Sequence, residues 1–301
     1  MGSQPKLPPV LVLGIAIIAI SWGAILIRWA SAPSTVTAFY RILFTVLPLL
    51  PLGFWYHRDA FRRIRLRDWL FGILAGVALA LHFATWFESL EWTSVAASVT
   101  LVQSQPIFVA IGALILLHER VTRRMSIGIV IAVGGIITMS VGDLMQTASL
   151  ESSAMYGNAL ALSGAILAAG YVLAGRSLRQ RIAIIPYVII VYSACTLTLA
   201  LLLISQGHAF TGYPQTDWIL FALLAIGPGL LGHTLINWSL KYVESSVVSV
   251  ALLGEPIGAT LLALLLLVEV PSQFTIIGGA IVLSGIYLTA RERNQIRPDE
   301  P

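Results

Sequence analysis

One block of sequence occurs twice in the chain and decides its fold. "SLEWTSVAASVTLVQSQPIFVAIGALILLHE" (Ser89–Glu119) aligns without a gap on "SLKYVESSVVSVALLGEPIGATLLALLLLVE" (Ser239–Glu269). Both copies are apolar, both carry a proline in the middle, and both end on a glutamate. Two glycine matches follow the block: Gly128 with Gly278, and Gly135 with Gly285. The sequence is therefore predicted to consist of two related halves.

The composition indicates a protein of the membrane. The chain has 301 residues, of which 57% are hydrophobic and 11% charged, whereas a soluble domain is about 25% charged. Its mean hydropathy is +0.88. Segments near 10–29, 35–56, 69–88, 94–117, 124–142, 155–175, 182–205, 218–240, 246–268 and 273–290 are each long and apolar enough to cross about 30 Å of hydrocarbon as a helix. We expect an all-α integral membrane protein with ten transmembrane helices.

The basic residues predict the orientation of these helices. Nearly all of the 18 Lys and Arg residues fall in alternate connections, such as "HRDAFRRIRLRD" after the second segment. Because basic loops stay in the cytoplasm, both termini are expected there. The protein itself is expected to lie in the inner membrane of a bacterium. The basicity thus reflects topology, and no nucleic-acid partner is expected. Residues 1–150 and 151–301 hold five helices each, so the second half enters from the opposite face as an inverted repeat.

Several classes of protein lack their signatures in this sequence. There is no phosphate-binding G-x-x-x-x-G-K-[ST] motif, no H-E-x-x-H and no G-x-S-x-G. The five histidines are scattered without metal-ligand spacing, and Cys195 is the only cysteine. We therefore expect neither an enzyme nor a protein with a metal or another cofactor.

A carboxylate stands inside one of the most apolar segments. Glu255 precedes Pro256, and its counterpart in the first half, Gln105, precedes Pro106. A proline removes one backbone hydrogen bond from a helix, and the freed group must be satisfied within the protein. One interpretation is that Gln105 and Glu255 support two equivalent helix breaks. The other is that Glu255 binds a ligand or a proton, as ionisable residues inside membranes commonly do.

The duplicated block, "SWGAILIRW" (Ser21–Trp29) and "YR" (Tyr40, Arg41) resemble the EamA family of the drug/metabolite transporter superfamily. Within that family, the chain is similar to the bacterial YddG-type exporters of aromatic amino acids. The resemblance covers nearly the whole chain. It implies two inverted five-helix halves around a central cavity, and it makes Glu119 and Glu269 part of the scaffold.

Polar and aromatic residues at helical spacing are the candidates for substrate binding. His82 and Trp86 share one helix face with Thr85 and Ser89, so they are expected to line the cavity. Trp22 lies deep in the first segment, and Tyr171 is its approximate counterpart in the second half. The complete set of candidates is His82, Trp86, Trp22, Gln105, Glu255, Tyr171, His233 and Asn237.

Two arginines lie away from the cytoplasmic connections. Arg28 ends the first segment, and Arg41, near the start of the second, is expected to extend outward or face an entrance. No cation is evident at mid-depth, which disfavours phosphorylated substrates and leaves neutral, zwitterionic or mildly cationic ones.

These observations predict a secondary transporter that exports amino acids by alternating access. The preference for aromatic or other apolar amino acids follows from the resemblance. Its partners would be this small-molecule substrate and the lipid bilayer, and the protein would be monomeric. The alternatives are a carrier for several drugs or quaternary amines, in which Glu255 pairs with the cation, and a membrane assembly protein without a transport cycle.

Overall fold

A computed structural model of the chain describes residues 8–117, 122–146, 151–179, 181–232, 235, 252 and 254–295. Within these ranges all regular structure is helical. The first half contains α1 (Pro9–Trp29), α2 (Ser34–Val46), α3 (Leu49–Tyr56), α4 (Arg58–Arg62), α5 (Leu66–Trp92), α6 (Val95–Val102), α7 (Gln105–Leu117) and α8 (Arg123–Gln146). The second contains α9 (Glu151–Leu178), α10 (Ile184–Ser205), α11 (Gln215–Leu224), η1 (Ala225–Gly232), α14 (Gly254–Leu266) and α15 (Gln273–Gln295).

Many of these helices suit a membrane. Within the described ranges, six are long and apolar enough to cross one, and the shorter apolar helices Val95–Val109, Ser126–Thr138, Gly254–Leu266 and Gln273–Leu288 accompany them. Large apolar side chains stay exposed on their outer faces, among them Leu70, Leu74, Ile166, Leu201, Ile204 and Leu265. So wide an exposed apolar surface is unfavourable in water, and lipid would cover it in a membrane.

Three of the expected segments are not continuous α-helices, and Pro106 had already indicated a break in one of them. The segment 35–56 divides into α2 and α3 beside Pro48, and 94–117 divides into α6 and α7. The segment 218–240 begins as α11 and continues as the π-helix η1, which contains Pro228. In each case a proline lies at or near the irregularity, because its nitrogen has no hydrogen to donate to the helix. Length and hydropathy locate such segments but do not resolve these breaks.

The break between α6 and α7 has a local cause. Ser94 caps α6 by accepting a hydrogen bond from the backbone N–H of Ala97 at 3.1 Å. Gln103 and Ser104 form a turn after it. Pro106 lies in the first turn of α7, where its missing N–H costs little. Pro256 lies in the first described turn of α14.

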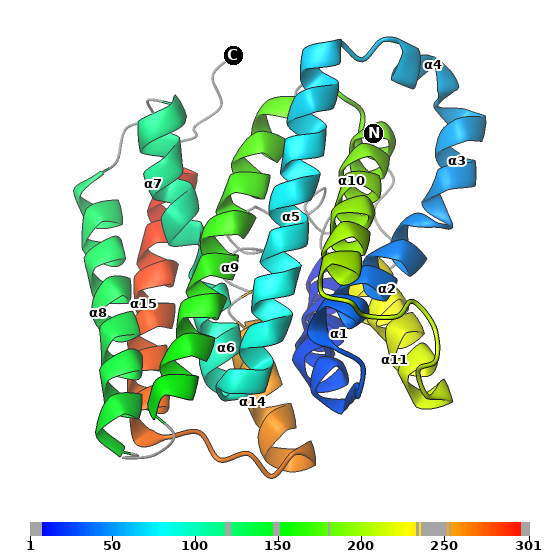
Figure 1. Ribbon diagram of the computed structural model, residues 1–301. Helices are drawn as coiled ribbons and strands as arrows, with labels where there is room; N and C mark the ends of the chain where they lie inside the picture. Colours follow the sequence, from blue (N-terminus) through cyan, green and yellow to red (C-terminus); the bar gives the residue numbers. More distant parts are fainter. Residues whose placement is uncertain are drawn as a thin grey trace.

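The last helices of the two halves, α8 and α15, lie side by side (Figure 1). A Cβ added to Gly135 would lie 2.6 Å from the carbonyl oxygen of Gly278. A Cβ added to Gly285 would lie 2.5 Å from the carbonyl oxygen of Gly128. The contact is therefore reciprocal: Gly135 of α8 meets Gly278 of α15, and their counterparts in the repeat, Gly285 and Gly128, meet in the same way. Increasing residue numbers along α8 are matched by decreasing residue numbers along α15, so the two helices run antiparallel.

The remaining helices pair by the same exchange. The first membrane segment of each half packs on the third membrane segment of the other: α1 contacts η1, and α9 contacts α5. The first helix of each half also packs on the fourth of the other, so that α1 contacts α14 while α9 contacts α6 and α7. These crossed pairings leave the inner faces of both halves turned toward a common centre.

Candidate functional site

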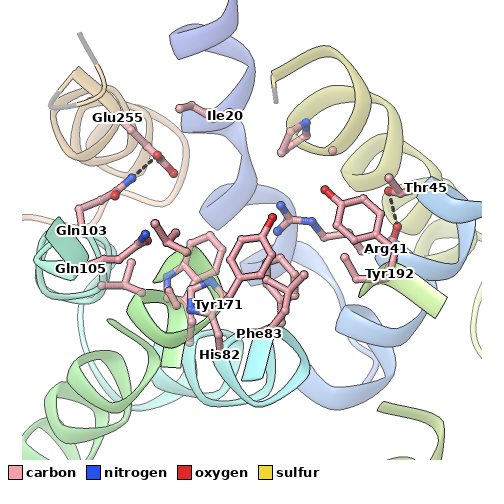
Figure 2. A pocket seen from close by; sticks show the side chains of 18 of the residues that line it. Ile20, Arg41, Thr45, His82, Phe83, Gln103, Gln105, Tyr171, Tyr192 and Glu255 are labelled. Carbon is pink, nitrogen blue, oxygen red and sulfur yellow. Dashed lines mark hydrogen bonds between the residues drawn. The ribbon is translucent and has the colours of Figure 1, made fainter. Parts of the chain in front are cut away.

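A cavity of about 290 Å³ lies between the two halves (Figure 2). Its volume is near the lower end of the roughly 300–1,000 Å³ typical of small-molecule sites. The first half contributes Ile20, Arg41, Ile42, Thr45, Leu79, His82, Phe83, Trp86, Val102, Gln103 and Gln105. The second half contributes Ala168, Tyr171, Val172, Tyr192, Pro228, Gly229, Leu252 and Glu255. The space thus fits a small solute that contacts both halves.

Glu255 is held on one side of this cavity. It lies near the described start of α14. The side-chain amide of Gln103, from the turn after α6, donates a hydrogen bond to its Oε2. Glu255 therefore both joins the two halves and presents charge to the cavity, so the two interpretations of this residue are compatible. The sequence singled out Gln105 as its counterpart, and Gln105 also lines the cavity.

Aromatic side chains form the floor of the cavity. Figure 2 shows His82, Phe83 and Tyr171 together between the two sides. The Nδ1 of His82 donates to the carbonyl oxygen of Gly164 at 2.9 Å, which fixes the ring between α5 and α9. The ring of His82 stacks on that of Trp86, with centroids 5.9 Å apart. This cluster offers a flat apolar surface to a ligand.

The position of Arg41 corrects the prediction from sequence. Its side chain neither extends outward nor faces an entrance: it is only 3% exposed and lines the cavity on the side opposite Glu255 (Figure 2). The ring of Phe83 lies 4.6 Å from its guanidinium carbon. A cation is therefore present in the wall, contrary to the expectation drawn from the apparent depth of Arg41 in its segment. α2 is short and most of its residues are buried, which hydropathy does not reveal.

Trp22 is not among the residues that line the cavity. Ile20 is the residue of α1 that does so, and Trp22, two positions later, is about 200° further round the helix. Its ring instead lies 6.2 Å from that of Trp29. Trp22 therefore lies outside the lining of this cavity, and its part in binding stays a prediction. His233 and Asn237 fall outside the described residues.

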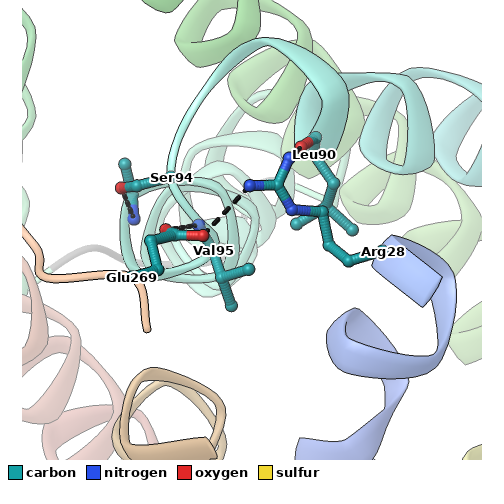
Figure 3. Close-up of polar contacts among 6 residues, drawn as sticks. Arg28, Leu90, Ser94, Val95 and Glu269 are labelled. Atoms are coloured by element: carbon teal, nitrogen blue, oxygen red, sulfur yellow. Dashed lines mark hydrogen bonds and ion pairs between the residues drawn. The ribbon is translucent and has the colours of Figure 1, made fainter. Parts of the chain in front are cut away.

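Glu269 ties several helix ends together (Figure 3). Its Oε1 accepts from the backbone N–H of Val95 at 2.6 Å, and its Oε2 pairs with Arg28 at 3.1 Å. Arg28 also donates to the carbonyl oxygen of Leu90 at 2.5 Å. The start of α6 and the end of α1 thus meet at one carboxylate, and Arg28 links them to the end of α5. This is the scaffold role expected for Glu269, while Glu119 lies outside the described residues.

A larger hollow of about 690 Å³ opens elsewhere, among the helix ends around residues 30–35. Glu88 and Glu91 lie in its wall. It is formed mainly by connections and helix ends, whereas the central cavity is enclosed by helices of both halves. We therefore take the smaller cavity as the candidate binding site.

The sequence did not single out three residues that the fold brings to the site. Gln103 was not identified because the residue that aligns with Glu255 is Gln105, two positions later. Phe83 follows His82 directly, and an apolar residue in an apolar segment gives no signal of a site. Tyr192 comes from α10, which carried no polar pattern. The spacing of Arg41, Phe83 and Tyr192 in the chain gives no sign that they meet.

Residues 9–141 and 155–291 each match the EamA-like transporter family. Two proteins of Archaeoglobus fulgidus, both named "Uncharacterized transporter", are similar to the chain. One is 24% identical over 261 residues, which cover 86% of this chain and 88% of that protein. The other is 28% identical over 197 residues, which cover 62% of this chain and 65% of that protein. A solved crystal structure superposes with a TM-score of 0.61 at 19% identity, over 93% of this chain and 96% of its own.

Proposed function

Because the chain belongs to the EamA-like transporter family, we propose that it is a secondary transporter that exports amino acids by alternating access. The family and the transporter relatives point to a transporter and not to an enzyme. The observation that carries the finer proposal is the chemistry of the cavity. It combines an aromatic floor with a carboxylate, Glu255, on one side and a guanidinium, Arg41, on the other.

This combination suits an aromatic or other apolar amino acid. The ring of such a substrate would lie against His82, Trp86 and Tyr171, because aromatic pairs add about 0.5–1.5 kcal/mol beyond the burial of their area. Its ammonium group would pair with Glu255, and Gln105 would contribute a further polar group. A doubly negative phosphate is disfavoured here because Glu255 faces the same space as the guanidinium of Arg41.

The transport cycle would rely on inverted halves, residues 1–150 and 151–301. The reciprocal glycine contacts of α8 with α15, and the crossed pairing of the other helices, support this arrangement. Inverted repeats around one site are the usual frame of alternating-access carriers. We propose a monomer in the inner membrane of a bacterium, with both termini in the cytoplasm as the basic connections indicate.

A second candidate is a carrier of drugs or quaternary amines. Glu255 in the cavity wall favours it, since a carboxylate and aromatic rings together bind such cations. Arg41 argues against it, because a guanidinium in the same cavity repels a cation. A membrane assembly protein without a transport cycle is the remaining alternative.

Uptake into liposomes containing the purified protein separates these functions. Tryptophan and phenylalanine should enter in a saturable manner, above the level of empty liposomes, while a cationic dye should not. The assay is run with and without a pH gradient. Uptake of the dye alone would favour the amine carrier, and uptake of none of these solutes would favour the assembly protein.

A further inference from the structure

Arg41 is a buried cation whose hydrogen-bonding capacity is largely unused. Its Nε and Nη1 are buried and have no hydrogen-bond partner among the described residues. Aromatic rings surround the guanidinium, with the centroids of Phe83 and Phe87 at 4.6 and 5.5 Å from its central carbon. These rings attract the positive charge, but they accept no ordinary hydrogen bond. The N–H groups of Nε and Nη1 therefore remain unsatisfied within the described residues.

Trp86 adds another donor of the same kind. It is 6% exposed, and its Nε1 is likewise buried without a partner in the described part of the chain. Its ring centroid lies 6.0 Å from the guanidinium carbon of Arg41, and both residues line the cavity. Residues of α2 and α5 that carry unpaired donors thus belong to the wall of one cavity.

Unpaired donors of this kind are costly in dry surroundings. A buried polar group without a partner costs about 1–3 kcal/mol, and more when it is charged. The carboxylate that faces the same cavity, Glu255, already accepts a hydrogen bond from Gln103 on the opposite side (Figure 2). Within the described residues Arg41 makes no ion pair. A ligand that accepts hydrogen bonds and carries one negative charge would relieve this cost.

We propose that Arg41 and the Nε1 of Trp86 form a subsite for a carboxylate. Guanidinium groups bind carboxylates through parallel N–H donors, and the indole N–H would add a neutral donor. The inference rests on the proposed function, since it names the group that binds the acid end of the amino acid. The Nδ1 of His82 is already engaged by the carbonyl oxygen of Gly164, so that nitrogen is not available to the same carboxylate.

The test compares two ligands that differ only in this group, 3-phenylpropionate and 3-phenylpropionamide. Their affinities for the purified full-length protein are measured by titration calorimetry. The wild-type protein should prefer the carboxylate. Arg41→Gln should weaken carboxylate binding by about 10- to 100-fold, the amount expected for a charged hydrogen bond, and leave the amide unaffected. Arg41→Lys should lose less, because it keeps the charge but not the paired donors.

Two further variants complete the design. Arg63→Gln removes an exposed arginine from the connection before α5 and should leave both affinities unchanged. Trp86→Phe keeps a ring but removes the N–H, so carboxylate binding should fall by about 2- to 10-fold. This variant also carries the test if Arg41→Gln does not fold, as judged by its melting temperature and by size-exclusion chromatography.

The outcomes separate this subsite from the proposed function. A wild-type protein that binds both ligands alike, or an Arg41→Gln or Trp86→Phe protein that folds and retains the full preference, overturns the subsite. If the carboxylate preference depends on Arg41 and on Trp86 but liposomes take up no amino acid, the subsite stands and amino-acid export fails. If amino acids are transported and Arg41→Gln transports them with unchanged KM, export stands and the subsite fails.

Discussion

The side-chain amide of Gln103 donates a hydrogen bond to Oε2 of Glu255, and this bond joins the turn of the broken helix in the first half to the first described turn of α14 in the second. The two residues are 152 positions apart in the chain. Both line the central cavity. The bond therefore holds a charged group in place at the point where a solute would pass between the halves.

Glu255→Gln should separate the structural contribution of this residue from its charge. The substituted amide still has an oxygen that accepts from Gln103, so the melting temperature should change little. Loss of the charge should weaken binding of ammonium-bearing substrates by about 1.5–3 kcal/mol, or roughly 10- to 100-fold in KM when KM follows affinity. Uptake of tryptophan in liposomes measures this effect. An unchanged KM would show that Glu255 supports the helix break only.

Trp86 is expected to determine the preference for aromatic substrates. Trp86→Ala removes a ring from the cavity wall and should weaken transport of tryptophan by about 1–3 kcal/mol. Alanine, which has no ring to place there, should be affected much less. Trp86→Phe should lose less tryptophan transport than Trp86→Ala because a ring remains. An equal loss for every substrate, together with a lower melting temperature, would assign Trp86 to helix packing instead.

The seam between α8 and α15 offers a matched pair of substitutions. Gly135 is buried against Gly278, so Gly135→Ala forces the helices apart and should destabilise the protein by about 1–3 kcal/mol. Gly134 is exposed and a Cβ there meets nothing within 4 Å. Gly134→Ala should therefore be neutral or stabilising by up to about 1 kcal/mol. Thermal unfolding in detergent measures both. Similar melting temperatures for the two variants would contradict the close approach.

The orientation of the two halves can be tested with single cysteines. Cys195 is buried and is first replaced by alanine. Cysteines are then placed singly at Arg63, in the connection before α5, and at Ser153, near the start of α9. An impermeant thiol reagent should label them from opposite sides of the membrane. Labelling of both from one side would rule out the inverted arrangement.

The sequence predicted the helical membrane fold well because hydropathy and the repeat are strong signals. The repeat also pointed to Pro106 and Pro256, and the structure has Pro106 in the first turn of α7 and Pro256 in the first described turn of α14. The side chains around the cavity were harder to predict. The face presented by Trp22 depends on the rotation of α1, and a rotation cannot be obtained from an apolar pattern that surrounds the whole helix.

Arg41 gives a second reason why the sequence did not predict all the residues of the site. A cation near the end of an apolar segment normally extends toward the membrane surface. Here the aromatic rings of Phe83 and Phe87 on α5 draw it inward instead. That attraction arises from tertiary packing between helices, which a linear pattern does not encode.

The closely packed pair of α8 and α15 has a consequence for how this kind of protein diversifies. None of the described residues that line the cavity comes from either helix. Their contact is made by backbone atoms at glycines together with apolar side chains such as Ala132 and Val282, so it does not depend on the chemistry of the lining. Substitutions at the cavity can therefore accumulate without loosening this seam. Over many generations, one durable frame could be fitted to new solutes by changing a handful of side chains around the hollow.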